Sequence, residues 1–256
     1  MPTVESYQPG TPSWVDLASP DLASSSAFYS SLFGWEAVGL GPEAGGYRMF
    51  ELGGTPVAGG APIMMEGQPP AWTTYVSVDD ADQTIAKVKS AGGMVFVEPM
   101  DVLDVGRMAV FADPTGAAIA LWQPKAHKGA EIVNEPGAFT WNELNTRDTA
   151  AATSFYREVF GWGTDVTATP AGNYAQWTLD GRPIGGMMAM PADVPAEVPS
   201  FWLTYFATAD CDATVAKATE LDATVTVAPM DIAPGRFSVL TDPQGAMFAV
   251  IAMVSA

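Results

Sequence analysis

The sequence predicts an α+β fold made of two tandem modules, and three observations support this prediction. Residues 14–35 and residues 141–162 match without a gap, at an offset of 127 positions. Each copy then continues with short runs that alternate apolar and polar residues, as strands do. Each copy ends in a GRxxxxxDPxG segment, at 106–116 and at 235–245. A two-copy repeat of this length indicates a pair of small domains rather than a solenoid.

The repeat divides the 256 residues into a first module at 10–122, a linker at 123–136 and a second module at 137–252. The linker is polar and contains two prolines. A small domain buries little surface on its own, so we expect the modules to pack about a pseudo-twofold axis. The expected architecture is two tandem βαβββ modules that pair into curled mixed or antiparallel sheets around a cleft.

The first half of a module is predicted to run strand, helix, strand, strand. In the first copy the strand covers 14–17, and Asp21 is a candidate N-cap for the helix. Gly34 suits the C′ position that ends this helix. Strands follow at 47–52 and 55–64. The second copy repeats these elements as a strand at 141–144, a helix between Asp148 and Gly161, and strands at 174–179 and 182–190.

The second half of a module is predicted to contain one more helix between strands. The run WTTYVSV at 72–78 alternates like a strand, and a helix follows from Asp80 or Asp82 to Gly92. Two strands are expected near 94–98 and 107–112, and a last strand after the DPTG turn. The second copy has WLTYFAT at 202–208, a helix from Asp210 and a DPQG turn.

The charge of the chain excludes several classes of partner. It has 29 acidic and 11 basic side chains, for a formal net charge of −18. A phosphate backbone repels such a surface, so we expect no nucleic-acid binding. We expect no association with an anionic membrane for the same reason. Hydrophobic residues make up 48% of the chain and charged residues 16%, which indicates a globular protein rather than a disordered one.

The N-terminal residues and the cysteine content agree with a cytoplasmic protein. The first ten residues, MPTVESYQPG, have neither a basic nor an apolar region, so we expect no secretory signal. No run of apolar residues is long enough for a spanning helix. Cys211 is the single cysteine and His127 the single histidine. An intrachain disulfide and a multi-histidine metal site are therefore excluded within one chain, and His127 in the linker is expected at the surface.

The repeated residues resemble a known family. Both copies carry FYxxxFGW, at 28–35 and 155–162, and the DPxG turn near the last strand. Together these motifs resemble the vicinal oxygen chelate superfamily, which includes glyoxalase I, extradiol dioxygenases and bleomycin-resistance proteins. The resemblance covers both modules. Within the superfamily, the chain most resembles the tandem actinobacterial members that are described as glyoxalase-like or hydroxylase-like. It implies paired βαβββ modules whose sheets curl around a shared cleft.

The resemblance also implies where a divalent metal would bind. Family members place a ligand on the first strand, seven residues before the helix-capping aspartate, and another on the last strand, seven residues after the DPxG aspartate. These positions are Trp14, Trp141, Ala120 and Ala249. Neither an indole nor a methyl group offers a lone pair to such a cation. We therefore expect no metal site and no cofactor.

Two acidic residues are the candidate catalytic groups. Asp16 and Glu143 are aligned by the repeat and lie two positions after Trp14 and Trp141, so each shares a strand face with its tryptophan. If the first strands meet near the pseudo-axis, the two carboxylates lie close and act as a general acid/base pair. They also suit a cationic ligand, with indole faces beside them. The alternative is structural: capping a backbone N–H, or pairing with Arg107 or Arg236.

The remaining candidates are ligand-binding residues. The aromatic lining comprises Trp14, Trp122 and Trp141, and the same strands contribute Ala120 and Ala249. Arg107 and Arg236 follow a glycine in both copies and suit a substrate carboxylate. For the tryptophans the alternative is a place in the core, and for the arginines an ion pair with the aspartates of the DPxG turns.

Three functions remain open at this point. The first is a metal-independent member of the family that binds or detoxifies a small apolar or aromatic molecule in the cleft. The second is a non-catalytic interaction protein, for example one that binds a serine/threonine kinase, since the net charge suits a basic partner. The third is a lyase or hydroxylase of the superfamily. Because the duplication supplies both modules, a monomer and a homodimer are both allowed.

Overall fold

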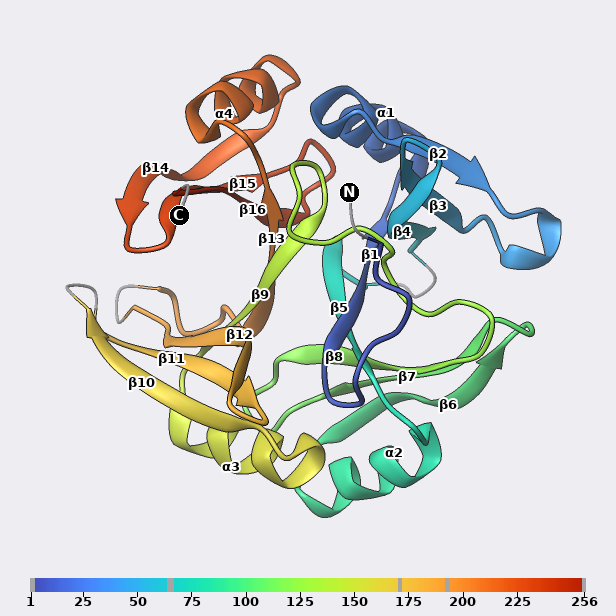
Figure 1. The fold of residues 1–256 in the computed structure, drawn as a ribbon, viewed down its shortest axis with the longest axis vertical. Helices are drawn as coiled ribbons and strands as arrows, with labels where there is room; N and C mark the ends of the chain where they lie inside the picture. The colour runs from blue at the N-terminus through green and yellow to red at the C-terminus, as the bar shows by residue number, and fades with distance from the viewer. Residues whose placement is uncertain (1–2, 64–66, 170–171, 192–193, 255–256) are drawn as a thin grey trace.

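The computed structural model describes the chain except for residues 1–2, 64–66, 170–171, 192–193 and 255–256. Each module contributes one eight-stranded mixed sheet and two helices (Figure 1). The α+β class, the two tandem modules and the curled mixed sheets are thus confirmed. No helix in the described ranges is long and apolar enough to cross a membrane.

The first module follows the expected order of elements. Its sheet has the strand order β2-β3-β4-β1-β5-β8-β7-β6. The elements are β1 (Pro12–Ser19), α1 (Leu22–Phe33), β2 (Glu36–Gly39), a 3-10 turn (Pro42–Ala44), β3 (Arg48–Leu52), β4 (Thr55–Pro62), β5 (Ala71–Ser77), α2 (Ala81–Ser90), β6 (Met94–Val102), β7 (Gly106–Ala112) and β8 (Ala118–Pro124).

The second module repeats this order, strand for strand. Its sheet is β10-β11-β12-β9-β13-β16-β15-β14. The elements are β9 (Phe139–Thr146), α3 (Thr149–Phe160), β10 (Gly163–Thr169), β11 (Gly172–Leu179), β12 (Arg182–Ala189), β13 (Phe201–Ala207), α4 (Cys211–Glu220), β14 (Thr224–Ile232), β15 (Gly235–Thr241) and β16 (Met247–Met253).

Two details differ from the sequence prediction. Within the described residues each module holds two βαβββ units in succession, which makes four such units in this part of the chain. The edge strands β2 and β10 were not predicted, because both are largely exposed and lack an apolar face to mark them. The fourth strand ends at Pro62, and position 64 of its predicted range lies outside the described residues.

The helix ends follow from the aligned capping residues. The Asp21 carboxylate accepts a hydrogen bond from the Ser24 N–H at 3.0 Å, and Asp148 accepts one from Ala151 at 2.9 Å. These bonds satisfy N–H groups that the first turn of a helix leaves free. Gly34 ends α1 with φ +77°, a backbone conformation that glycine adopts without strain. The same reasoning applies to Asp80 and Asp210, which cap α2 and α4.

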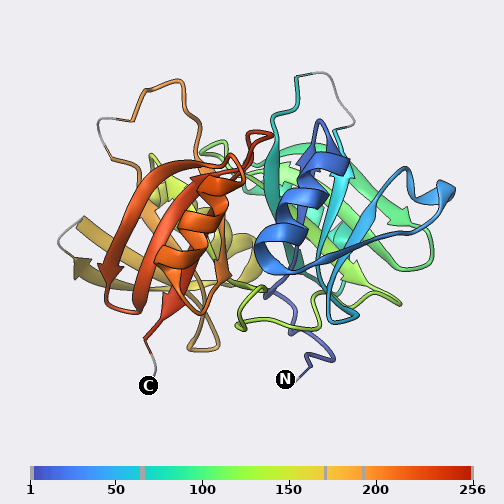
Figure 2. The same ribbon diagram turned by 90° about the horizontal axis from the view of Figure 1, so that it is seen from above.

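The two sheets pack back to back through their central strands. In Figure 1 sheet β1–β8 curls open toward the right and sheet β9–β16 curls open toward the left, so their concave sides point away from each other. Strands β5 and β13 contact across the boundary. Helix α1 lies beside α4, and α2 beside α3, at opposite ends of the boundary; Figure 2 shows the first pair from above.

The repeated FYxxxFGW motif holds the modules together. The Tyr29 hydroxyl donates to the Asp242 carboxylate of the second DPxG turn at 3.0 Å. The Trp35 indole donates to the Gly137 carbonyl at 2.6 Å, and in return Trp162 donates to the Gly10 carbonyl at 2.7 Å. The motif that reveals the repeat is therefore an inter-module contact, because each copy reaches into the other module.

Candidate functional site

Strand alternation decides which side chains face outward in the first module. Thr74 on β5 donates a hydrogen bond to Asn142 of the second module at 2.8 Å, so this side of the strand faces the boundary. Tyr75 therefore points to the concave side, since neighbouring residues in a strand face opposite ways. Cross-strand neighbours share a face, and Tyr75 pairs with Trp14 on β1 and Ala120 on β8.

These pairs define the first concave face. It carries Trp14, Asp16, Tyr75, Ala120 and Trp122. The second module has the same register, because Tyr205 on β13 pairs with Trp141 and Ala249. The second concave face therefore carries Trp141, Glu143, Tyr205, Ala249 and Ile251. Ile251 stands where the first face has Trp122.

The two candidate carboxylates do not form a pair. The expectation that Asp16 and Glu143 lie together at the pseudo-axis is wrong. Asn142 faces the boundary, where its side chain accepts the hydrogen bond from Thr74. Its neighbour Glu143 must then face outward, as Asp16 does on the other module. Each carboxylate therefore belongs to a separate concave face, and the cleft expected between the modules is replaced by packed side chains such as Trp72 and Phe206.

Glu143 is the centre of a hydrogen-bonded array on the second concave face. The Trp141 indole donates to the Tyr174 hydroxyl at 2.9 Å, and Tyr174 is hydrogen-bonded to Glu143. Tyr205 donates to Glu143 Oε1 at 3.1 Å, and Asn145 donates to the same oxygen at 3.3 Å. Because an indole N–H only donates, the Tyr174 proton is directed to the carboxylate.

Burial dominates the electrostatics of Glu143. The residue is 5% exposed, and this desolvation raises the pKa of its carboxyl. The hydrogen bonds from Tyr174, Tyr205 and Asn145 oppose the rise. No cationic side chain is among the described groups that shift its pKa. The site therefore holds a buried carboxyl surrounded by neutral donors.

The first concave face has a similar array with fewer hydrogen bonds to its carboxylate. The Trp14 indole donates to the Tyr47 hydroxyl at 3.0 Å, and Tyr75 donates to Asp16 Oδ2 at 2.8 Å. Tyr75 is the one hydrogen-bond donor among the described groups that act on the pKa of Asp16. Burial raises the pKa of this carboxyl to about 7. Since aspartate is one methylene shorter than glutamate, Asp16 is bonded by Tyr75 while Glu143 is bonded by both tyrosines.

Two glycines make room for the phenol rings. A Cβ at Gly59 would lie 1.8 Å from the Tyr47 hydroxyl, and one at Gly186 would lie 1.9 Å from the Tyr174 hydroxyl. Both glycines pair in register with the carboxylate residues Asp16 and Glu143. Any side chain there would displace the tyrosine from its indole. The tyrosines were missed as site residues, although the repeat already aligned Tyr47 with Tyr174 and Tyr75 with Tyr205.

His127 is not the surface residue that its polar neighbours in the linker predict. Its ring lies edge-on to Trp14, with centroids 4.5 Å apart, and 5.6 Å from Trp122. The Trp122 indole donates to the His127 carbonyl at 2.9 Å. The linker thus covers both tryptophans of the first concave face, which are 3% and 6% exposed. Trp141 on the second face stays partly exposed.

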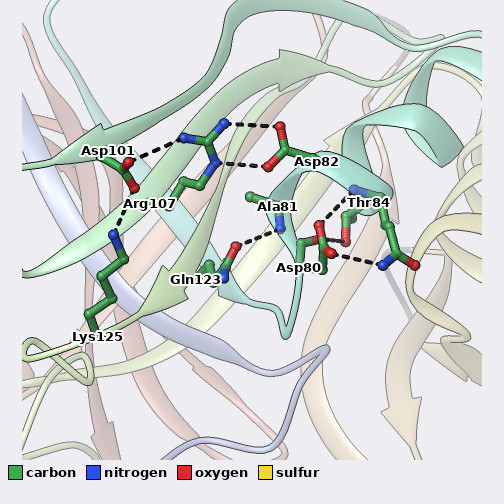
Figure 3. Close-up of polar contacts among 9 residues, drawn as sticks. Asp80, Ala81, Asp82, Thr84, Asp101, Arg107, Gln123 and Lys125 are labelled. Carbon is green, nitrogen blue, oxygen red and sulfur yellow. Dashed lines mark hydrogen bonds and ion pairs between the residues drawn. The ribbon is translucent and has the colours of Figure 1, made fainter.

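The two arginines lie on the helix side of the sheets. Arg107 is bound by Asp82 at 2.9 Å and approaches Asp101 at 3.7 Å, and Asp101 also pairs with Lys125 (Figure 3). Its strand neighbour Met108 faces Trp122 on the concave side, so Arg107 faces away from it. Arg236 pairs with Asp212 and Asp231 in the same way. The partners are thus not the DPxG aspartates, and neither guanidinium faces a concave side.

The positions at which the resemblance places metal ligands hold indoles and methyl groups, Trp14 with Ala120 and Trp141 with Ala249. The absence of a metal site at these positions stays a prediction. Each hydrogen-bonded array contains one carboxylate, Asp16 on the first face and Glu143 on the second. No group of three His, Cys, Asp or Glu side chains able to hold a metal occurs among the residues that the structure describes. The chemistry of these faces therefore rests on carboxyl, phenol and indole groups.

A separate cavity of about 370 Å³ lies between α3 and the strands β10–β12. Thr149, Thr153 and Arg157 are among its lining residues. Ala175, which also lines this cavity, stands where the first module has Arg48, and the Arg48 guanidinium donates to Ser26 at 3.1 Å.

Comparison with known proteins agrees with the duplicated architecture. The sequence model of the glyoxalase/bleomycin resistance protein/dioxygenase superfamily matches residues 11–121 and again residues 137–250. The chain belongs to this superfamily. The match covers each of the two modules once, so the resemblance seen in the repeated motifs is confirmed.

Relatives of full length occur in actinobacteria. The glyoxylase-like protein CFP32 of Mycobacterium bovis is 44% identical over 259 residues, covering 98% of both chains. The anthracycline biosynthesis protein DnrV of Streptomyces peucetius is 40% identical over 260 residues, covering 96% of this chain and 94% of that one.

Solved structures share the fold at low sequence identity. The Mn(II)-bound glyoxalase of Novosphingobium aromaticivorans superimposes with a TM-score of 0.67 at 16% identity, over 97% of this chain and 83% of that one. The 2,2′,3-trihydroxybiphenyl 1,2-dioxygenase of Sphingomonas wittichii gives 0.66 at 14% identity, over 96% and 91%. At such identities these matches bear on the fold alone.

Proposed function

We propose that the protein binds a small, uncharged aromatic or apolar molecule on its second concave face, and that Glu143 exchanges a proton with it. The array formed by Trp141, Tyr174, Glu143 and Tyr205 carries this proposal. It combines flat apolar rings with one acidic group, which is what a small-molecule site needs for affinity and orientation.

The exposure of the residues favours the second face over the first. Trp141 and Tyr174 are partly exposed, whereas Trp14 and Trp122 are buried under His127. A planar ligand can therefore reach the exposed part of Trp141. Phe201 and Phe237, both partly buried, extend the apolar surface on the same side.

Glu143 suits proton exchange because the net effect of its surroundings is to raise the pKa of its carboxyl above the ordinary value of a glutamate. Burial raises the pKa of its carboxyl, while three hydrogen bonds from neighbouring side chains lower it. General acid/base groups act best when their pKa lies near the working pH. The proposed role is thus proton transfer with a bound carbonyl or phenol, and the tyrosines keep the carboxyl oriented.

The relatives support the ligand class. One relative is named as glyoxylase-like, and another is named for the biosynthesis of anthracyclines, which are planar aromatic compounds. A planar quinone is therefore a suitable probe. Titration with 1,4-dihydroxyanthraquinone, followed by quenching of tryptophan fluorescence, should show saturable binding.

The variants Trp141→Phe and Trp14→Phe make a matched pair for this titration. Trp141→Phe should weaken binding about tenfold, a loss on the scale of one aromatic contact. Trp14→Phe, at the aligned position of the covered face, should leave it unchanged. Equal losses in both variants, or no saturable binding to the wild type, would contradict the proposal.

A protein-binding function has one observation in its favour. The edge strand β6 exposes Met94, Phe96 and Met100, at 65%, 50% and 49%. Combined with the net charge of −18, such a row suits a basic protein partner. Titration with a purified serine/threonine kinase domain would detect it, and Phe96→Ser should abolish that binding without affecting the quinone.

A further inference from the structure

The linker between the modules sends one aromatic side chain onto the first concave face. His127 lies edge-on to Trp14, with an interplanar angle of 83°, and at 69° to Trp122. Edge-to-face contacts of this kind stabilise aromatic pairs beyond the area they bury. The backbone holds the ring there, since the His127 N–H donates to the Val105 carbonyl at 3.0 Å and its own carbonyl accepts from Trp122.

The Nε2 atom of His127 does not help to hold the ring in place. His127 Nε2 is buried and has no hydrogen-bond partner among the described residues. A buried nitrogen without a partner costs free energy, so Nε2 does not stabilise the ring at this place. Burial also lowers the pKa of His127 to about 4, so the ring is uncharged at neutral pH. An uncharged planar ring is what the two indoles accommodate.

The second module shows the same surface without the histidine. Trp141 corresponds to Trp14 and stays partly exposed. Ile251 corresponds to Trp122 and contributes an apolar side chain. A planar ring reaching Trp141 must therefore come from outside the chain, whereas the ring on Trp14 comes from the linker.

We infer that the first concave face is a second binding site for a small, uncharged planar ring such as an azole, and that His127 occupies this site from within the chain. The inference goes beyond the proposed function and does not depend on any ligand of the second face. It makes the linker an intramolecular ligand: an external ring binds only when His127 is displaced or removed.

Removal of the ring gives a direct test. His127→Gly should leave a space of the size of an imidazole between the two indoles. Imidazole added at about pH 8, where it is largely uncharged, should bind this variant with an affinity in about the millimolar range. Binding is followed by tryptophan fluorescence and by recovery of the melting temperature, and the wild type should show neither. The permanent cation 1,3-dimethylimidazolium should not bind.

A matched pair of second substitutions locates the bound imidazole. Adding Trp122→Phe to His127→Gly should weaken imidazole binding about tenfold, because one of the two indole contacts is lost. Adding Trp141→Phe instead should leave the affinity unchanged. If both substitutions have the same effect, or if imidazole does not bind the folded His127→Gly variant, the inference is overturned.

The wild type provides a second test if His127→Gly does not fold. His127 is the single histidine, so its ring gives one set of proton signals, displaced by the ring currents of the two indoles. Titration with 4-methylimidazole should move these signals to the positions of an exposed histidine as the ring is displaced. If the His127 signals stay in place at saturating 4-methylimidazole, the ring does not occupy a site that an external ring can bind, and the inference is overturned.

Discussion

The first and second concave faces carry aligned residues, and two of the differences between them decide what each face can bind. On the second face a glutamate is bonded by both tyrosines, whereas on the first a shorter aspartate is bonded by Tyr75. On the first face His127 covers the indoles, whereas on the second Trp141 is partly exposed. The same framework therefore gives one filled face and one accessible face.

The largest effect should come from removing the tryptophan of each face. Trp14 is 3% exposed and packs under His127, so Trp14→Ala should lower the free energy of unfolding by about 3–5 kcal/mol. Trp141→Ala should cost less, about 1–2 kcal/mol, because part of that ring already contacts solvent. Urea denaturation measures both. Equal losses would mean that the faces are filled to the same degree.

The next effect is on the pH dependence of stability. Burial raises the pKa of Asp16 to about 7 in the folded chain, above its usual value. Between about pH 4 and pH 7 the folded state therefore keeps a proton that the unfolded state has lost, and the free energy of unfolding falls as the pH rises.

The contribution of Asp16 should be roughly 2–4 kcal/mol across this range. Asp16→Asn, which has no ionisable group, should remove it and flatten the profile measured by denaturation at successive pH values. Tyr75→Phe should make the pH dependence of the free energy of unfolding larger. It removes the hydrogen-bond donor that lowers the pKa of Asp16, so this pKa should rise further. A profile that is unchanged in Asp16→Asn would show that this carboxyl is not buried as described.

A smaller effect should follow from exchanging the two carboxylates. Asp16→Glu adds the methylene that the first face lacks, so the new carboxyl should reach Tyr47 and its pKa should fall. In Glu143→Asp the shorter carboxyl should lose its hydrogen bond with Tyr174, and the pKa of that carboxyl should rise. Each change corresponds to about 1 kcal/mol, one hydrogen bond to a carboxylate. Carbon-13 NMR titration of the side-chain carboxyls measures both, and shifts of the same sign would refute the comparison.

The smallest effect is expected from the arginines. Arg107 and Arg236 form ion pairs with exposed aspartates, and such pairs contribute little because water screens them. Arg107→Ala and Arg236→Ala should each lower the free energy of unfolding by about 1 kcal/mol or less. Binding of 1,4-dihydroxyanthraquinone should not change. A loss of binding in either variant would return the arginines to the list of ligand-binding residues.

Most of the fold could be predicted from the sequence because its signals are local and occur twice. Asp21 and Asp148 cap helices, Gly34 and Gly161 end them, and alternation marks the strands. The edge strands β2 and β10 escaped prediction because exposed strands lack that alternation. The strand faces of Asp16 and Glu143 could also be predicted, since a spacing of two fixes them.

The parts of the site that could not be predicted depend on contacts between distant residues. The alignment pairs Asp16 with Glu143, but only the back-to-back packing shows that they face opposite ways. The environment of His127 depends on how the linker packs against the turn before β7, where Val105 accepts the His127 N–H, and the polar linker sequence does not reveal this contact. The FYxxxFGW motif indicated the family. Its part in joining the modules appears only in the structure, where the indoles of Trp35 and Trp162 each donate to a carbonyl of the other module.

These two reciprocal hydrogen bonds between the modules have a consequence for the thermal unfolding of the chain. Trp35 is bonded to a carbonyl just before the first strand of the second module, and Trp162 to one just before the first strand of the first. Neither module can lose its structure without exposing an indole and a carbonyl belonging to its partner. Calorimetry should therefore show one cooperative transition for the whole chain, whose van't Hoff and calorimetric enthalpies agree. A molecule that binds one module would then raise the melting temperature of both.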